Sequence, residues 1–252
     1  MSRIKFLNTE IDNLTMDEAL ERIDGYIKED KSKFVVTANV DHIVQLEKGG
    51  ELTKAYKHAD MILTDGQPLI WISRLYKIPI REKISGSDLF PRLCDMAARK
   101  GYRMYFLGAE EGVAAKAAGN LKKRFYGLQV VGTYSPPKGF ENDEAEKEKI
   151  NRQIKEAAPH ILIIGLGTPK QELFMFHNKD ELGVPVSLGL GASLDFEAGT
   201  LKRAPRWMSS SGLEWFYRLL QDPGRLAKRY LVDDMKIWRL IYKYRPAARK
   251  KA

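Results

Sequence analysis

Residues 161–172 read ILIIGLGTPKQE, and this stretch decides the class of fold. Its four leading aliphatic residues predict a strand buried on both faces, as in a parallel sheet. Gly165 and Gly167 then allow a tight turn, and Pro169 suits the first turn of a helix. A buried strand, a glycine-rich turn and a helix together form the repeating unit of an α/β fold.

The same alternation continues on both sides of this stretch. From residue 104 onward, predicted strands alternate with predicted helices: 104–108, 113–125, 128–132, 143–157, 160–164, 169–179 and 184–190. Residues 34–37 and 61–64 read as two earlier buried strands, and Thr15 and Glu18 form a capping box that opens a helix. We therefore expect residues 1–200 to form an α/β body, with a Rossmann-like, mostly parallel sheet covered by helices.

The C-terminal end of the chain differs in composition from this body. Residues 201–252 hold 14 Lys and Arg against 4 Asp and Glu, and they hold three of the four Trp. The other 200 residues hold 28 basic and 29 acidic side chains, so they are nearly neutral. On a wheel of about 100° per residue, six basic residues of this tail share one arc: Arg225, Lys228, Arg229, Lys236, Arg239 and Lys243.

A basic amphipathic helix with interfacial aromatic residues predicts an appendage that binds an anionic membrane surface. Two alternatives remain open, a helix docked on the body with a solvated basic face and a segment that binds nucleic acid. Three Trp among many aliphatic residues fit lipid better than nucleic acid. We expect residues 201–252 to form this appendage, without nucleic acid as a partner.

The rest of the composition narrows the location and the chemistry. The single cysteine, Cys94, excludes an internal disulfide, fits a reducing compartment and is expected in the core. No apolar segment follows the N-terminal charges, and the longest apolar run, 161–167, is too short to cross a bilayer. We expect a cytoplasmic protein that spans no membrane. The four histidines lack metal-ligand spacing, and Asp195-Phe196-Glu197 is a poor Asp-x-Asp match, so no bound metal is expected.

Polar residues gather where the predicted strands end. Thr37 and Asn39 follow one strand, and Asp65 and Gly66 follow another. Ligands of such sheets bind beyond the carboxyl ends of the strands, so these side chains are expected to meet in one site. For Asn39 the alternative is a side chain that only caps the next helix.

The glycine-rich turns at 165–167 and 189–191 favour a phosphate, because free backbone N–H groups open the helix that follows. A plain turn is an equally good interpretation of this spacing. A dinucleotide fingerprint would need a third glycine, and Lys170 and Leu194 stand at those positions. An NAD-dependent Rossmann oxidoreductase is therefore the weaker alternative, and no cofactor is expected.

Several motifs, taken in order, resemble those of one enzyme family. They are TANVD at 37–41, TDG at 64–66, SGSDL at 85–89, GLGTPKQE at 165–172, RAP at 203–205 and GLEWFYRL at 212–219. The chain resembles the WecG/TagA/CpsF glycosyltransferases (glycosyltransferase family 26) over nearly its whole length. The resemblance implies an inverting, metal-independent enzyme at the inner face of the cell membrane. Such an enzyme moves a hexose, for example N-acetylmannosamine, from a UDP-sugar to a polyprenyl-diphosphate-linked sugar in teichoic acid or other cell-surface polysaccharide synthesis.

The resemblance also implies roles for single residues. Asp65 is the expected general base, and Thr37 is a second expected catalytic residue. The expected donor-binding residues are Asn39, Lys83, Gly108, Gly139, Phe140, Gly165, Gly167 and Gln171. The residues expected to bind the acceptor diphosphate are Arg218, Arg225 and Arg229. Near the sugar site the chain departs from the family, with Lys83 in place of a common Arg and Lys138-Gly139-Phe140 in place of Gly-Tyr-Phe.

Inverting transfer needs a base beside the acceptor hydroxyl, opposite the departing UDP. Gly66 lets the backbone turn at Asp65, and an edge position is expected to keep this carboxylate solvated and ionised. Without a metal, backbone N–H groups and Arg or Lys side chains must balance the leaving diphosphate. The sequence leaves the oligomeric state open between a monomer and a homo-oligomer.

Overall fold

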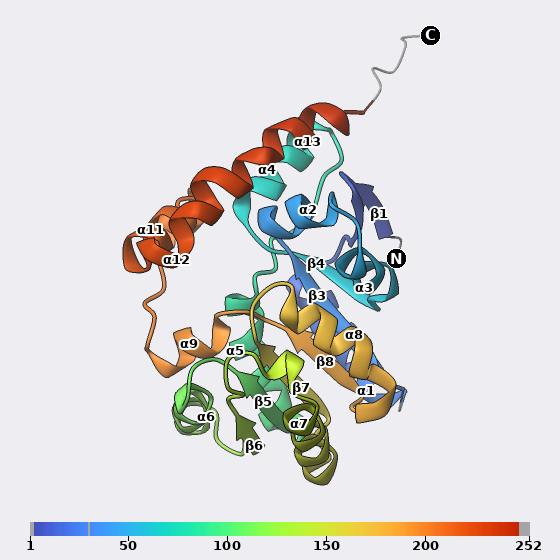
Figure 1. The fold of residues 1–252 in the computed structure, drawn as a ribbon, viewed down its shortest axis with the longest axis vertical. Coiled ribbons are helices and arrows are strands. Elements are labelled where there is room, and N and C mark those ends of the chain that lie inside the picture. The colour runs from blue at the N-terminus through green and yellow to red at the C-terminus, as the bar shows by residue number, and fades with distance from the viewer. Residues whose placement is uncertain (1–2, 30, 247–252) are drawn as a thin grey trace.

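The computed structural model describes residues 3–29 and 31–246. Its centre is a sheet of six strands in the order β4–β3–β8–β7–β5–β6, and every pairing in it is parallel (Figure 1). The strands are β3 Lys33–Ala38, β4 Met61–Thr64, β5 Arg103–Gly108, β6 Gln129–Tyr134, β7 Ile161–Gly165 and β8 Val186–Gly189. The predicted α/β sheet is confirmed, and each predicted strand lies within two residues of an observed one.

The aliphatic runs form these strands because both faces of the sheet are covered. Successive residues of one strand enter opposite cores: Ile161 and Ile163 pack in one cluster, and Leu162 and Ile164 in the other. The first face is covered by α1 Met16–Lys28, α5 Gly86–Lys100, α6 Val113–Arg124 and α9 Ser193–Ala198. The second face is covered by α3 Glu51–His58, α7 Glu144–Ala157 and α8 Lys170–Leu182. The capping box of Thr15 and Glu18 opens α1 as predicted, and Cys94 is buried in α5.

A third apolar cluster lies beyond the edge strand β4 and was not predicted. It joins an N-terminal hairpin to the segments that follow β3 and β4. Its elements are β1 Arg3–Phe6, β2 Thr9–Asp12, α2 Val40–Leu46, α4 Gln67–Leu75 and α13 Ile237–Lys243. The first and last parts of the described chain therefore pack together beside β4, the strand that Asp65 follows.

The tail is a series of short helices rather than one regular helix. The elements are α10 Arg206–Ser210, α11 Glu214–Gln221, α12 Pro223–Lys228, a π-helical turn η2 Arg229–Asp233, a 3-10 turn η3 Asp234–Lys236, and α13. Because the pitch changes three times between 223 and 243, a single wheel of 100° per residue does not describe this segment. The predicted arc of basic side chains therefore stays a prediction.

The last helices of the tail lie across α4 and α2, as Figure 1 shows in red. The Tyr76 hydroxyl donates to the Ile241 carbonyl, and Lys243 Nζ lies 2.5 Å from Glu47 Oε1. Ile237 and Leu240 are buried in the third cluster. The tail is thus docked on the body through both apolar and ionic contacts. Among the described residues, no helix combines the length and apolarity that crossing a membrane would require.

Candidate active site

The carboxyl ends of β3, β4, β7 and β8 face the tail across a cavity of about 590 Å³. Parallel strands end at the same edge of a sheet, so residues far apart in the chain meet there. The sequence-predicted residues that line this cavity are Thr37, Asn39, Asp65, Lys83, Gly167, Gln171, Arg218 and Arg229. The tail closes one side with Glu214 and Trp215, which were not predicted to lie here.

Asp65 directly follows β4, and its N–H donates to the Ala38 carbonyl at 2.7 Å. Gly66 has a φ of 101°, which confirms that the chain turns there in a conformation suited to glycine. The carboxylate is half-buried and accepts no hydrogen bond within the described residues. Burial raises its pKa to about 6; the Glu214 carboxylate acts in the same direction, and Lys83 and Arg218 oppose it.

The expectation that an edge position keeps Asp65 solvated and ionised holds only in part, because the carboxylate is half-buried and its pKa is raised to about 6. β4 is an edge strand, but the tail covers the end of it with α11. With a pKa of about 6, the ionised form still exceeds the protonated form about tenfold at pH 7. Asp65 is thus a carboxylate whose pKa lies close to neutral pH, and it has no hydrogen-bond partner among the described residues.

Thr37 and Asn39 lie at the end of β3, on the floor of the cavity. Thr37 is buried and donates from Oγ1 to the Gly189 carbonyl at 3.3 Å, which ties β3 to β8. The Asn39 side chain caps α2 by accepting from the His42 N–H at 3.2 Å. Asn39 therefore caps a helix and also lines the cavity, and its role in binding the donor stays a prediction.

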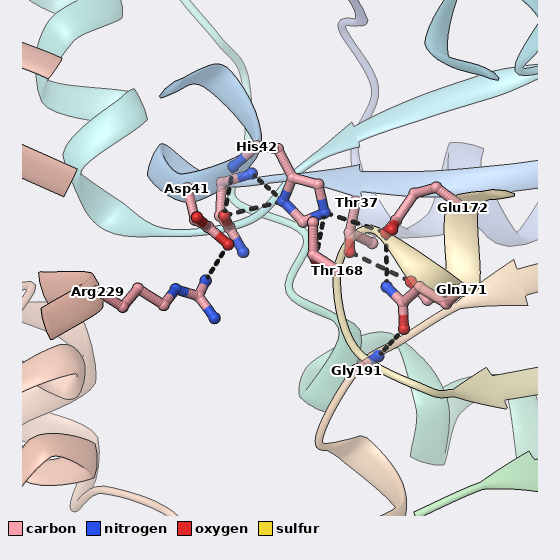
Figure 2. Close-up of polar contacts among 10 residues, drawn as sticks. Thr37, Asp41, His42, Thr168, Gln171, Glu172, Gly191 and Arg229 are labelled. Atoms are coloured by element: carbon pink, nitrogen blue, oxygen red, sulfur yellow. Dashed lines mark hydrogen bonds and ion pairs between the residues drawn. The ribbon is translucent and has the colours of Figure 1, made fainter. Parts of the chain in front are cut away.

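A buried polar network that sequence reasoning missed lies behind this floor (Figure 2). His42 Nε2 is 2.8 Å from Thr168 Oγ1 and 3.0 Å from Glu172 Oε1. Glu172 Oε1 also accepts from Gln171 Nε2 at 2.7 Å, and Gln171 Oε1 accepts from the Gly191 N–H at 3.1 Å. A sequence signal was present, because His42 directly follows the TANVD motif and Thr168, Gln171 and Glu172 lie within GLGTPKQE, each after a buried strand.

Four of the expected donor-binding residues lie outside this cavity. An added Cβ at Gly108 would lie 2.6 Å from the Gly165 backbone, and one at Gly165 would lie 2.9 Å from the Gly191 carbonyl oxygen. These two glycines thus allow three backbones to approach closely. Phe140 is buried in the core, and Gly139 precedes it with a φ of 89°. A second cavity of about 650 Å³ lies at the ends of β5 and β6, lined by the segments 109–115 and 133–138.

The arginines of the tail are placed differently from one another. Arg218 lies in α11 and lines the cavity. Arg229 reaches the body, where its guanidinium lies 3.1 Å from Asp41 Oδ2 (Figure 2). Burial, followed by the nearby Asp41 carboxylate, raises the pKa of Asp234 on the same side of the cavity to about 6. Arg225 belongs to α12, but its side chain lies outside the described part of the structure.

Lys83 is the remaining expected donor-binding residue. Its side chain is largely buried at the cavity wall, and Nζ lies 3.9 Å from Asp88 Oδ2. The Arg203 guanidinium also pairs with Asp88, so this carboxylate is shared between two cations. Among residues 3–29 and 31–246, no group of three or more His, Cys, Asp or Glu side chains is arranged to hold a metal ion. Metal independence remains a prediction.

Comparison of the sequence with known proteins identifies the family, and the match extends over both the strand ends and the tail. The profile of the Glycosyl transferase WecG/TagA/CpsF family matches residues 4–251. The chain belongs to this family. Glycosyl transfer is therefore its class of activity.

Curated relatives within the WecG/TagA/CpsF family share a single printed name, N-acetylglucosaminyldiphosphoundecaprenol N-acetyl-beta-D-mannosaminyltransferase. The relative from Bacillus spizizenii is 34% identical over 79% of this chain and 76% of its own length. The relative from Staphylococcus aureus strain MW2 is 26% identical over 99% of this chain and 94% of its own length. The similarity therefore includes the tail as well as the body.

Proposed function

We propose that this enzyme transfers N-acetylmannosamine, or a closely related hexose, from a UDP-sugar to a polyprenyl-diphosphate-linked N-acetylglucosamine, with inversion and without a metal. One observation carries the proposal: Asp65, with its pKa raised to about 6, lies in a cavity that has polar strand ends on one side and the tail on the other. The printed names of the relatives suggest which sugars are transferred and accepted, and Asp65 in the cavity is the candidate base.

The reaction is a single displacement in which Asp65 acts as the general base. The acceptor hydroxyl gives its proton to the Asp65 carboxylate while its oxygen forms a bond to the anomeric carbon. The bond from that carbon to the diphosphate oxygen breaks, and UDP leaves with the electron pair from the opposite face. A base with a pKa near the working pH is the most effective in this role, and such catalysis typically contributes about 10²- to 10⁴-fold.

The leaving diphosphate needs positive charge or N–H donors. α8 begins beside the cavity after the turn at Gly167, and no side chain caps its N-terminus. The Gln171 N–H already donates to the Gly167 carbonyl at 3.0 Å, but the N-terminal end of the helix as a whole still suits a phosphate. Lys83 and Arg218 add positive charge on the wall of the same cavity, and preorganised donors of this kind stabilise charge as it develops.

The acceptor side of the cavity is apolar and open. Exposed apolar side chains of α4 and the tail line the cavity: Trp71, Leu75, Trp215, Leu231, Met235 and Trp238. Such a rim suits the interface of a membrane and the first part of a polyprenyl chain. We infer that the enzyme binds the inner face of the cell membrane as a peripheral protein, with this rim toward the lipid.

The experiment is a transfer assay with UDP-N-acetylmannosamine and a short-chain polyprenyl-diphosphate N-acetylglucosamine, with and without EDTA. We expect UDP release and a lipid-linked disaccharide whose new bond is inverted relative to the donor, at equal rates under both conditions. Absence of any product with this donor and with other UDP-hexoses would contradict the proposal. Loss of activity with EDTA that is restored by Mg²⁺ would refute the metal-independent part alone.

An NAD-dependent oxidoreductase and a nucleic-acid-binding protein are the alternatives from other classes. Family membership argues against both. The oxidoreductase would also need a complete dinucleotide fingerprint, and Lys170 and Leu194 occupy the two positions where its third glycine would stand. The same assay separates these alternatives, since neither releases UDP from a UDP-sugar.

A further inference from the structure

The His42 ring lies between two helices and contacts an oxygen at each of its nitrogens. Nδ1 is 2.9 Å from Asn39 Oδ1, and Nε2 is 3.0 Å from Glu172 Oε1. His42 is 2% exposed and Glu172 is 0% exposed, so water is excluded from both groups. The ring also packs 5.8 Å from Tyr56, measured between ring centroids.

The short contacts indicate which ring nitrogens carry hydrogens. The Asn39 backbone N–H also faces Nδ1 and would donate to it in a neutral ring, but at 3.4 Å it is farther away than the amide oxygen at 2.9 Å. Asn39 Oδ1 already accepts from the His42 backbone N–H, so the atom facing Nδ1 is the carbonyl oxygen of the amide. If Nδ1 carried no hydrogen, its lone pair would face a lone pair of Asn39 Oδ1 at 2.9 Å, and the two would repel each other. At Nε2, a carboxylate oxygen of Glu172 only accepts. The two short contacts are both satisfied when both ring nitrogens donate, which makes His42 an imidazolium beside the Glu172 carboxylate; only the longer contact with the Asn39 N–H is then lost.

Each member of this pair holds a side chain that lines the cavity. His42 holds Asn39 by its oxygen, so the amide nitrogen, Nδ2, is left without a partner among the described residues. Glu172 holds Gln171 by its nitrogen, and Gly191 holds the Gln171 oxygen. Both amides are thereby prevented from flipping. His42 Nε2 also contacts Thr168, a third residue of the cavity wall.

We propose that His42 and Glu172 form a buried ion pair that positions the amides of Asn39 and Gln171 to recognise the donor sugar. Both are positioning residues, since they act through side chains that face the cavity. The inference rests on the proposed function only for the nature of the ligand, a nucleotide-linked hexose. Hydroxyl and acetamido groups of a hexose need donors and acceptors in fixed places, whereas UDP alone lacks the hexose that carries these groups.

A buried ion pair is rarely kept for stability, because removing two charges from water costs about as much as their attraction returns. Glu172 Oε2 is buried and has no hydrogen-bond partner within the described residues, so the pair is not even fully satisfied. A role in fixing the geometry of a site accounts for an arrangement that stability alone does not favour.

The experiment compares Glu172→Gln with the wild-type enzyme in two binding measurements. The variant keeps the shape of Glu172 and an oxygen for Gln171, but it removes the charge that balances His42. We expect isothermal calorimetry to show UDP affinity unchanged within about twofold and UDP-N-acetylmannosamine affinity lowered about tenfold or more, the loss of about one good polar contact. Asp24→Asn is the matched control, because Asp24 is another buried carboxylate, which pairs with Lys28 and Lys100 outside the cavity.

A second measurement does not depend on any variant of Glu172. Nitrogen-15 NMR of histidine-labelled wild-type protein, with the His42 signal assigned by its absence in His42→Gln, reads whether each ring nitrogen carries a hydrogen. We expect hydrogens on both. A neutral ring, or equal losses of UDP and UDP-sugar affinity in Glu172→Gln, or no loss of either, would overturn the inference. If the wild-type protein binds UDP but no UDP-sugar, the proposed function fails instead, and the NMR result alone decides whether the ion pair exists.

Discussion

Folding makes the Asp65 carboxyl harder to ionise than it is in the unfolded chain. Its pKa of about 6 lies above the value of about 3.9 for an unfolded aspartate, so the ionised carboxylate destabilises the fold, by at most about 3 kcal/mol. The penalty is absent below about pH 4 and complete above about pH 6. We expect Asp65→Asn to raise the melting temperature at pH 8, and to raise it less at pH 4.5. Scanning calorimetry at the two pH values checks this, and an unchanged or lower value at pH 8 would contradict the raised pKa.

Glu214 of the tail tunes the same carboxylate. Its negative charge raises the pKa of Asp65, so removing that charge should lower the pKa. In Glu214→Gln we expect the acid limb of the pH–rate profile, near pH 6 in the wild-type enzyme, to move to lower pH. Glu148→Gln, an exposed position in α7, is the control and should leave the limb in place. An acid limb that does not move in Glu214→Gln would show that α11 does not act on Asp65.

At the scale of elements, the seating of α11 depends on one glycine. Gly212 has a φ of 68°, and a Cβ added there would lie 2.4 Å from Cη2 of Trp71 in α4. Gly212→Ala must therefore displace the Trp71 ring or shift the start of α11, and it also strains the backbone at a positive φ. Either change disturbs the placement of Glu214 and Arg218. We expect about a tenfold or larger loss of transfer rate with a smaller effect on UDP affinity.

Gly224 provides the matched control for this prediction. It lies in α12, and a Cβ added there meets no atom within 4 Å. Gly224→Ala should retain nearly full transfer activity, because alanine also favours a helix. If the two variants lose activity to the same extent, the contact between Gly212 and Trp71 does not position α11.

The regular part of the fold follows from local patterns, and the rest does not. Aliphatic runs such as 161–164 predict the strands because burial on both faces leaves few other residues suitable. The hairpin β1–β2 was missed because its strands are only four residues long and are stabilised by distant segments, α4 and α13. The pitch changes of the tail were missed for a similar reason, since contacts with α2 override the preferences of the segment itself.

The candidate site could be predicted in part. Thr37 and Asp65 were found because polar residues at strand ends converge in an α/β sheet, whatever lies between them in sequence. The pair His42 and Glu172 was not found, because the two residues lie 130 positions apart in the sequence and only the tertiary fold brings them together. The partial burial of Asp65 was missed because nothing local shows that the tail covers an edge strand.

At the scale of the whole molecule, the tail offers lipid an apolar surface more than a basic one. Arg229 and Lys243 are engaged with Asp41 and Glu47 of the body, and Lys236 lies 2.8 Å from Asp233 of the preceding turn, η2. Trp238 and Leu231, in contrast, are 64% and 57% exposed near the cavity mouth. Membrane binding should therefore depend strongly on apolar contacts.

We expect the double variant Leu231→Ser/Trp238→Ser to lose most of its binding to vesicles, measured by flotation, with UDP affinity retained. Tyr126→Ser is the control, because Tyr126 is fully exposed but lies in the turn before β6, outside the cavity lining. Added salt should weaken wild-type binding only in part, since apolar burial is not screened. Unchanged flotation of the double variant would refute this orientation on the membrane.

The division into a body of residues 1–200 and an appendage remains a prediction, as does a homo-oligomer.

The central claim is that Asp65 is the base of an inverting sugar transfer, and the pH dependence of turnover in Asp65→Asn tests it most directly. In the wild-type enzyme we expect kcat to rise with pH through about 6 and then level off, because only the ionised carboxylate accepts the acceptor's proton. In Asp65→Asn we expect kcat to fall by about a hundredfold or more at every pH above that limb, with the limb itself gone and donor affinity little changed. A variant that turns over at nearly the wild-type rate, or that keeps the same acid limb, would contradict the account.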